Sequence, residues 1–321
     1  MNYPSEFSLI DRCFRPLAGD GALDLADDAA VLTPPQGREL VIAADALVET
    51  VHFLPDDPAG SVGRKLLRTN LSDLAAMGAV PLGYLMTVAV PKERGEAWLQ
   101  DFAEGLAADQ REFGLSLLGG DTVSTPGPIS LSLTVLGHVA PSAALRRSGG
   151  RPGHDLWVSG TVGDGILGLR ARRGAIGDED GYLTSRYRLP QPRLMLGQSL
   201  VGFAACAMDV SDGLVQDLGH ICRASGCGAE IFSGSIPLSL PAKEWLRTKP
   251  GGLIELLAGG DDYELLFSAP AEAAVEIQHR AKACDTLVTR IGRLVSGEMR
   301  VSLVDIFGNP MPVQAGGWSH F

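Results

Sequence analysis

The sequence predicts an α/β chain of two domains, with an α+β arrangement in the first, and three observations support this. Its 321 residues exceed the length that one compact core usually supports. Apolar residues in the first half recur alternately at strand and helix spacing, in the order β-α-β-α-β-β, which favours one sheet with helices on one face. Residues 140–153 are rich in Pro, Ser, Arg and Gly, which predicts a linker between domains at 1–139 and 140–321.

The first domain is expected to begin with a helix over Glu6–Leu17, because apolar side chains recur there at helical spacing. An acidic turn at Asp27–Asp28 leads into a short strand. The remaining elements, in order, are a strand over Leu40–Ala44 that ends at Asp45, a helix over Val62–Gly78 capped by Ser61, a strand over Gly83–Val90, a helix over Gly95–Phe113 closed by Gly114, a strand from Leu115 that stops at Gly119–Gly120, and an alternating strand over Ile129–Val139. Asp45 and Asp121 are therefore expected at strand ends, where side chains project into a crevice.

The predicted helix over Val62–Gly78 carries polar side chains on its apolar side. A helical wheel places Asn70 and Asp73 in the apolar half, whereas Lys65 and Arg68 fall on the opposite half with other polar residues. An inward carboxylate without a partner costs several kcal/mol. Asp73 is therefore expected either to make an ion pair or a capping contact with a neighbouring loop, or to face a metal ion.

The second domain is predicted to be a further α/β unit. Its strands are expected at 156–159, 206–210, 229–232, 263–268 and 287–294, and its helices at 194–205, 211–225 and 271–283, with Ser211 as the N-cap of the second helix. Gly163, Gly165 and Gly168 match the G-x-G-x-x-G pattern of dinucleotide sites. The acidic residue that should end a second strand about 20 positions later falls in a polar turn instead. These glycines are therefore expected to shape a strand-to-helix turn.

Composition and charge argue against several classes of protein. The net charge of −11 disfavours nucleic acid and anionic membrane surfaces as partners. The N-terminus shows no signal-peptide pattern, and no apolar run approaches the roughly 20 residues of a membrane span. The five cysteines show no C-x-x-C pairing, which favours reduced thiols in the cytoplasm over a disulfide framework or a zinc site. The P-loop motif is also missing.

Carboxylates at the borders of apolar segments indicate the chemistry. The set consists of Asp28, Asp45, Asp73, Asp121, Asp209 and Asp212. If these side chains converge they repel one another, since a pair about 4 Å apart costs about 4 kcal/mol at an effective dielectric near 20. Such a cluster requires cations, and all-oxygen ligands select Mg²⁺ or Ca²⁺. The pattern predicts a site with several Mg²⁺ ions for phosphoryl transfer from a nucleotide. The alternative is that these aspartates are separate caps and turns.

Eight segments of the chain resemble thiamine-monophosphate kinases, in order and over nearly its whole length. They are Asp27–Leu32, Asp45 with His52–Phe53, Asn70–Gly78, Leu118–Thr122, Arg188–Arg193, Asp209–Gly213, Asp262–Leu265 and Gly317–Phe321. The family belongs to a superfamily of ATP users that also holds aminoimidazole ribonucleotide synthetase and selenophosphate synthetase. Its members resemble one another in the early Asp and Gly-Gly-Asp motifs.

This resemblance implies a fold, an assembly and a reaction. The ferredoxin-like N-terminal sheets of two subunits would pair into a barrel, giving a homodimer with ATP sites near the interface. The C-terminal α/β domain would complete the active site. ATP would give its γ-phosphoryl group directly to thiamine monophosphate, yielding thiamine diphosphate and ADP without a covalent intermediate.

The same resemblance implies roles for particular residues. Several Mg²⁺ ions would be held by Asp28, Asp45, Asp73, Asp121, Asp209 and Asp212, and catalysis would depend most on Asp121, Asp45 and Asp73. The residues that contact ATP would be Gly120, Asp121, Arg147 and Ser211. Thiamine monophosphate would be held by His52, Asp261 and Trp318. As alternatives, His52 would cap a turn and Trp318 would pack on the second domain.

Departures from the family pattern bear on these roles. Ala43 and Ala44 stand where the family usually has Ser-Thr before Asp45, so hydroxyl groups are missing there. Asp261 stands where a Glu is usual, which keeps the charge but shortens the reach. Two other functions remain open. One is a different ATP-using enzyme of the superfamily, of the ribonucleotide cyclase or selenophosphate synthetase type, and the other is a non-catalytic nucleotide or metal sensor.

Overall fold

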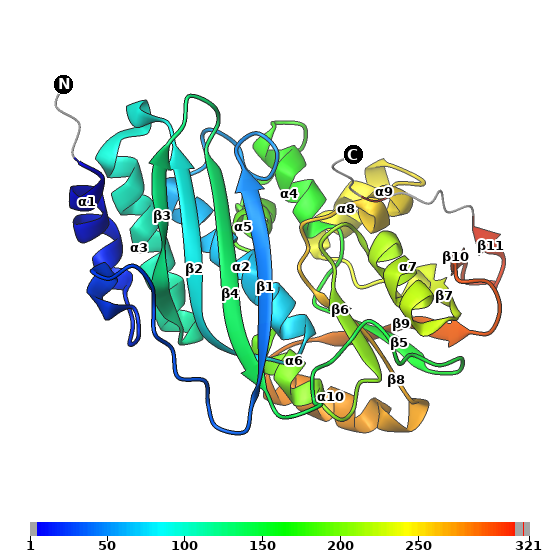
Figure 1. Ribbon diagram of the computed structural model, residues 1–321. Helices are drawn as coiled ribbons and strands as arrows, with labels where there is room; N and C mark the ends of the chain where they lie inside the picture. The colour runs from blue at the N-terminus through cyan, green and yellow to red at the C-terminus, as the bar shows by residue number, and fades with distance from the viewer. Residues whose placement is uncertain (1–4, 312–316, 318–321) are drawn as a thin grey trace. The chain divides into compact units, whose positions relative to one another are not determined.

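The chain folds into two compact units of mixed α/β architecture (Figure 1). The computed structural model describes residues 5–311 and 317. Unit 1 comprises Met1–Leu74 with Ala79–Ser142, and unit 2 comprises Ala75–Gly78 with Ala143–Phe321. Within the described ranges, no helix combines the length and the apolar character that crossing a membrane requires. The α/β class predicted from the sequence is confirmed.

Unit 1 contains a four-stranded sheet with the strand order β1-β4-β2-β3. Its elements are α1 (Glu6–Leu9), η1 (Ile10–Phe14), η2 (Arg15–Leu17), η3 (Leu23–Leu25), β1 (Glu39–Val48), α2 (Ala59–Ala76), β2 (Val80–Val90), η4 (Lys92–Arg94), α3 (Gly95–Phe113), β3 (Ser116–Ser124) and β4 (Ser130–Val139). Strands β2 and β3 are parallel, whereas β4 is antiparallel to both β1 and β2. Helices α2 and α3 cover one face of the sheet (Figure 1), as the β-α-β-α-β-β pattern predicts.

Two strands of unit 1 extend beyond their predicted ends. Asp45 lies within β1, which continues to Val48 because β4 supplies pairing partners along that whole length. The Gly119-Gly120-Asp121 segment lies within β3, which β2 pairs as far as Ser124. The prediction that Asp45 and Asp121 follow strand ends is therefore wrong. The short strand expected after Asp28 is also not formed.

The helices of unit 1 differ from prediction mainly at their N-terminal ends. Residues 6–17 are helical throughout, but as three short segments of different helix type. Helix α2 begins at Ala59, so Ser61 is not its cap, and the Ser61 hydroxyl donates to the Pro58 carbonyl at 2.7 Å. Helix α3 matches its predicted range, and Gly114 ends it in the left-handed conformation.

Most of the polar half of α2 is buried. Arg68 is 1% exposed, and its guanidinium donates to both carboxylate oxygens of Asp109 on α3, at 2.7 and 2.9 Å. Lys65 is 2% exposed, and its Nζ donates to the His52 carbonyl at 2.9 Å. A wheel separates polar from apolar residues, but it does not reveal that a second helix supplies partners for the polar half.

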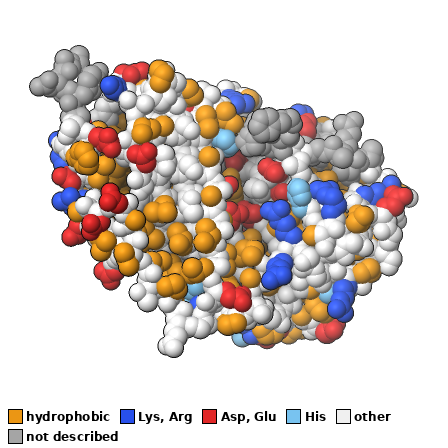
Figure 2. Space-filling view, viewed as in Figure 1, with side chains coloured by type: hydrophobic (Ala, Val, Ile, Leu, Met, Phe, Trp, Pro, Cys, Tyr) orange, Lys and Arg blue, Asp and Glu red, His pale blue; other side chains and the backbone are white. Residues whose placement is uncertain are grey.

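The sheet face opposite α2 and α3 carries several apolar side chains that the described residues of unit 1 leave exposed. We call it the open face, and its large exposed hydrophobic residues are Leu40, Ile42, Val80, Leu85 and Val123, of which Ile42 is 60% exposed. Strand pairing places these residues on one side of the sheet. Hydrophobic side chains gather over this sheet in Figure 2. An apolar face of this kind is typical of an interaction surface.

Unit 2 contains a seven-stranded mixed sheet with the order β11-β10-β7-β9-β5-β8-β6. Its elements are β5 (Asp155–Ser159), α4 (Asp164–Arg172), α5 (Tyr182–Arg188), α6 (Leu194–Leu200), β6 (Cys206–Asp209), α7 (Leu214–Ser225), β7 (Gly228–Phe232), η5 (Ser233–Ser235), α8 (Leu240–Thr248), α9 (Leu253–Ala258), β8 (Leu265–Ala269), η6 (Ala271–Ala273), α10 (Ala274–Ala283), β9 (Val288–Val295), β10 (Val301–Val304) and β11 (Pro310–Met311). The five strands predicted here correspond to β5–β9. Helices α5, α8 and α9 were not predicted.

Of the three glycines in the G-x-G-x-x-G pattern, Gly163 lies in the predicted strand-to-helix turn, whereas Gly165 and Gly168 lie within α4. Gly163 is the N-cap of α4 at φ +87°, a conformation that favours glycine. A Cβ at Gly165 would lie 2.5 Å from the Asp261 carbonyl, and one at Gly168 would lie 2.2 Å from the Leu183 carbonyl. The pattern therefore allows the backbone of α4 to approach two other segments closely.

Candidate active site

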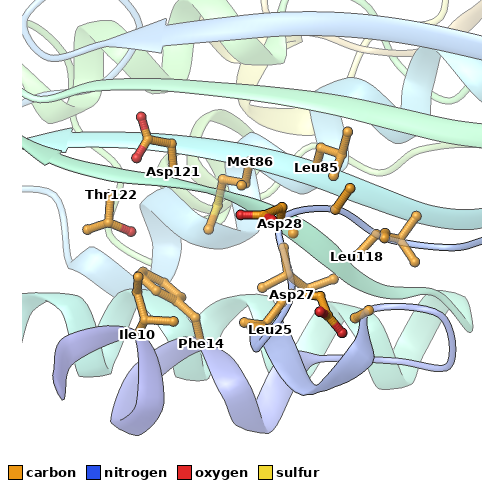
Figure 3. Close-up of a pocket in the computed structure, with 16 residues that line it drawn as sticks. Ile10, Phe14, Leu25, Asp27, Asp28, Leu85, Met86, Leu118, Asp121 and Thr122 are labelled. Atoms are coloured by element: carbon orange, nitrogen blue, oxygen red, sulfur yellow. The ribbon is translucent and has the colours of Figure 1, made fainter. Parts of the chain in front are cut away.

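A pocket of about 410 Å³ lies in unit 1 between the N-terminal helical turns and strands β2 and β3 (Figure 3). Ile10 and Phe14 contribute apolar side chains to its lining. Asp28 and Asp121, two of the predicted metal ligands, line the same pocket. Apolar side chains beside carboxylates suit a ligand that combines a ring with a charged group.

The residue before Asp121 has to be glycine. Gly120 has φ +156°, and a Cβ there would lie 1.8 Å from the Met86 carbonyl of β2. Asp121 pairs with Thr87 and is exposed, and Figure 3 shows Asp121 and Thr122 projecting from β3 in opposite directions. The Asp121 carboxylate therefore lies on the open face, where it is accessible to a ligand.

The carboxylates of unit 1 form two separate groups. Asp45 and Asp121 lie on the two outermost strands, β1 and β3, with β4 and β2 between them. Asp45 pairs with Leu133, whose side chain is buried on the helix side, so Asp45 and Asp121 face opposite sides of the sheet. Three strand spacings amount to about 14 Å, whereas Mg²⁺ binds oxygen at about 2.1 Å. One ion therefore cannot bridge these two residues within one copy of unit 1.

Asp45 of β1 is instead hydrogen-bonded to a side chain of α2. Its backbone N–H donates to the Asn70 side-chain oxygen at 3.0 Å, and Asn70 is fully buried. Asp73 follows Asn70 by three residues and is half-buried, so both project from the same side of α2. The inward position that the wheel predicts for Asn70 is confirmed, and Asn70 joins α2 to Asp45 of β1.

His52 is held in one tautomer by the turn that follows β1. The Val48 N–H donates to His52 Nδ1 at 3.0 Å, so Nε2 carries the proton in the neutral ring. Lys65 fixes the same turn through the His52 carbonyl. The turn-capping alternative for His52 is therefore seen.

In unit 2, the segment after β6 places three polar groups together. Asp209 is buried, whereas Ser211 and Asp212 are half-buried in the turn that leads into α7. Gly213, with φ +118°, is the N-cap of α7, so the prediction that Ser211 caps this helix is wrong. Across the described part of the chain, no three His, Cys, Asp or Glu side chains are arranged to hold one metal ion.

Asp217 is a member of this group that the sequence reasoning missed. One of its carboxylate oxygens accepts the N–H groups of Asp212 and Gly213, both at 3.1 Å. Burial, and then the charges of Asp209 and Asp212, raise the pKa of Asp217 to about 8. A carboxylate in the first turn that bonds back to the start of its helix is a known capping arrangement, and this spacing was the available signal.

The Asp217→Asn variant should be more stable than the wild type at alkaline pH without metal. Asn retains one oxygen that accepts both N–H groups but carries no charge. The pKa of Asp217 is raised in the folded state, so its contribution to stability is full below about pH 4 and is lost as the pH rises to about 8. Between these values the free energy of unfolding of the wild type falls by about 1.4 kcal/mol per pH unit. Urea unfolding in EDTA should show that the free energy of unfolding of the variant, relative to that of the wild type, increases over this pH range.

A matched control is Asp305→Asn. Asp305 also accepts turn N–H groups, from Phe307 and Asn309, and these hydrogen bonds lower its pKa. The free energy of unfolding of this control, relative to that of the wild type, should not increase with pH. Parallel stability curves for the wild type and the Asp217 variant would contradict the account of Asp217.

Arg147 and Asp212 both act electrostatically on His220 of α7. Burial, Arg223 and Arg147 lower the pKa of His220, whereas Asp212 acts in the opposite direction. Arg147 is exposed, and its carbonyl accepts the Ser225 hydroxyl at 3.3 Å. An exposed arginine of this kind can contact phosphate oxygens.

Asp261 lies in the loop between α9 and β8. Its N–H donates to the Ser211 carbonyl at 2.9 Å, so unit 2 places Asp261 beside the Asp209–Gly213 segment. It is half-buried and has φ +70°, which is unfavourable for a residue with a side chain. Trp318, the other predicted acceptor contact in this part of the chain, lies outside the described residues.

Comparisons with known proteins give consistent matches over both units. The family described as "AIR synthase related protein, N-terminal domain" matches residues 26–139, and its C-terminal counterpart matches residues 151–304. The thiamine-monophosphate kinase of Caulobacter vibrioides is 47% identical over 300 residues, covering 92% of this chain and 85% of that protein.

Solved structures are also similar. The crystal structure of thiamine-monophosphate kinase from Stenotrophomonas maltophilia K279a is 41% identical, with a TM-score of 0.84, covering 93% of this chain and 96% of that one. AaThiL complexed with AMPPCP and TMP is 29% identical, with a TM-score of 0.79, covering 98% of this chain and 97% of that one.

Proposed function

The chain belongs to the thiamine-monophosphate kinases, within the AIR synthase related family, and we propose that it transfers the γ-phosphoryl group of ATP to thiamine monophosphate. The complex of AaThiL carries this proposal, because a relative aligned over 98% of this chain holds both AMPPCP, an ATP analogue, and TMP. The products are thiamine diphosphate and ADP. The acceptor is a phosphate oxygen that is already anionic, so the reaction needs no strong general base.

Magnesium fits the carboxylates that the structure presents. The proposed ligands are Asp28, Asp45, Asp73, Asp121, Asp209 and Asp212. Oxygen donors of this kind select hard cations. Mg²⁺ held by these carboxylates would neutralise the charge of the phosphates during phosphoryl transfer.

The chain's own residues bind and orient the two substrates. We assign the Gly120–Asp121 backbone, Ser211 and Arg147 to ATP. The Gly120–Asp121 backbone lies on the edge strand β3, Ser211 lies in the turn before α7, and Arg147 is an exposed cation. His52, Asp261 and Trp318 are assigned to thiamine monophosphate. His52 would donate from Nε2, since Nδ1 is engaged by Val48. Catalysis then rests on holding donor and acceptor in line rather than on a covalent intermediate.

The open face supports a homodimer. Residues 1–139 would bind ATP and Mg²⁺ and pair with the same domain of a second copy, forming a barrel from two sheets. Residues 140–321 would complete the active site. Burying an apolar face in this way is favourable, because each Å² of apolar surface removed from water contributes about 25 cal/mol to association. The reaction is assigned to the cytoplasm, in keeping with free cysteines at all five positions.

The Ile42→Lys variant should convert the dimer to a monomer. Ile42 is 60% exposed on the open face, so lysine is tolerated in unit 1 but would bring an unpaired charge into the interface. Size-exclusion chromatography with light scattering measures the mass directly. The Val275→Lys variant, at an 81% exposed position of α10, should remain dimeric. A dimeric Ile42 variant or a monomeric wild type would refute the proposed interface.

An assay of the purified chain tests the function. With Mg-ATP and thiamine monophosphate it should form thiamine diphosphate and ADP in equal amounts, detected by chromatography. Turnover only with a ribonucleotide amidine or with selenide would favour the superfamily alternatives. Binding of ATP without turnover of any of these substrates would favour a sensor.

A further inference from the structure

The segment that carries Asp261 holds three acidic residues, of which only Asp261 is not fully buried. Asp262 and Glu264 are 1% and 0% exposed, whereas Asp261 is half-buried. Asp261 and Tyr263 both adopt positive φ, at +70° and +51°. Residues with side chains rarely adopt this conformation, so surrounding contacts must impose it.

Glu264 ends this segment, and its contacts reach the segment's backbone through Arg186, which also donates to the Asp262 carbonyl at 3.4 Å. Arg193 donates to both of its carboxylate oxygens, at 2.7 and 2.6 Å, and Arg186 donates to one of them at 2.8 Å. The Ser159 hydroxyl donates at 2.5 Å. Burial raises the pKa of Glu264, but Arg193 and Arg186 outweigh it and the pKa is lowered, which keeps the group ionised. Such an arginine fork fixes a carboxylate in both distance and orientation.

Asp262 holds the other side of the segment. Its two oxygens accept the N–H groups of Gly163 and Gly165, at 2.7 and 2.9 Å. Gly165 has no space for a side chain, because a Cβ would lie 2.5 Å from the Asp261 carbonyl. The Tyr263 N–H donates to the Val210 carbonyl at 2.8 Å. The backbone of Asp261 is therefore enclosed between α4 and the segment after β6.

These contacts separate the roles of neighbouring acidic residues. Glu264 and Asp262 are enclosed and bonded to the protein itself, so neither is available to a substrate. Asp261 is the more accessible of the three, and its direction depends on the positive φ that its neighbours impose. A correctly directed carboxylate suits a cationic ring such as the thiazolium of thiamine.

We propose that Glu264 is a positioning residue, which acts through the Arg193 fork and the backbone of residues 261–263 to direct the Asp261 carboxylate at thiamine monophosphate. This inference rests on the proposed function. It also accounts for three acidic residues within this short segment without assigning Asp262 or Glu264 to the substrate. Loss of the fork should weaken binding of the acceptor and leave binding of ATP unchanged.

A double-mutant cycle between Glu264→Gln and Asp261→Ala tests this role with the full chain. Glu264→Gln should raise the KM for thiamine monophosphate about tenfold, with the KM for ATP changed less than about twofold. In the Asp261→Ala background, the same Glu264 substitution should change the KM for thiamine monophosphate by less than about twofold. A general structural defect would instead raise both KM values or act equally in both backgrounds.

Two further variants make the outcome decisive. Arg193→Lys keeps the positive charge but loses the fork, so it replaces Glu264→Gln in the same cycle if that variant does not fold. Glu230→Gln removes a comparable arginine contact, from Arg293 at 3.0 and 2.8 Å, elsewhere in unit 2 and should leave both KM values unchanged. Additive effects in the cycle overturn the positioning role alone. A wild type that does not turn over thiamine monophosphate overturns the proposed function and this inference together.

Discussion

Replacing Asp121 by asparagine should lower kcat by about 100- to 1000-fold, equivalent to about 3–4 kcal/mol of transition-state stabilisation. Asp121 is exposed on the open face and lines the pocket, so the substitution removes charge without disturbing the core. Its backbone conformation is set by Gly120 and by pairing with Thr87, and both remain. The Mg²⁺ concentration needed for half-maximal activity should rise as well.

Steady-state kinetics over a Mg²⁺ titration measures both effects, and thermal unfolding checks that the fold is intact. Asp20→Asn is a suitable control, because Asp20 is an exposed carboxylate of the same unit that does not line the pocket. Its kcat should match that of the wild type. An Asp121 variant with unchanged kcat and unchanged Mg²⁺ dependence would remove this residue from the site.

Replacing Asp109 by alanine should lower the free energy of unfolding by about 3–5 kcal/mol. Asp109 is fully buried and accepts hydrogen bonds from Arg64 at 2.8 Å and from Arg68 at 2.7 and 2.9 Å. Without it, Arg68 would remain buried and would lose its two-oxygen partner, although Glu112 would still accept from it at 2.7 Å. A buried cation that loses its main partner is costly because it has also lost its hydration.

Urea unfolding of the two variants Asp109→Ala and Glu112→Gln separates the buried pair from its partly exposed neighbour. The Glu112 side chain is 44% exposed, so its substitution should cost under about 1 kcal/mol. A double variant that replaces Arg68 and Asp109 with Met and Leu should recover much of the loss, because the buried charges are then removed together. A loss below about 1 kcal/mol for Asp109→Ala would show that this ion pair does not stabilise unit 1.

Elements with strong local patterns could be predicted closely. Helix α3 was predicted to its observed ends because its apolar stripe is regular and Gly114 provides a left-handed stop. The N-terminus of α2 was misplaced by a few residues, since a plausible cap such as Ser61 is only one of several ways to start a helix. The ends of β1 and β3 were also misplaced, because a strand extends as far as its neighbours pair with it.

For the candidate site, too, part could be predicted from the sequence and part could not. Its acidic residues could be selected from the sequence because carboxylates beside apolar segments are unusual and costly. Their grouping could not be selected, since it depends on which strand lies next to which and on the face each residue occupies. The contacts of Asp217 and Glu264 could not be predicted because their partners, among them Arg193, are identified only once the chain is folded.

By itself, the sequence determined the α/β class, the order of the elements in unit 1 and the residue types that favour phosphate and Mg²⁺ chemistry. These follow from short-range periodicity and from the charge of individual side chains. Only the tertiary structure decided that Asp45 and Asp121 lie on opposite faces of one sheet, and that Asp261 is held at positive φ beside Ser211. Such relations join residues far apart along the chain, and the packing that creates them depends on all the elements together.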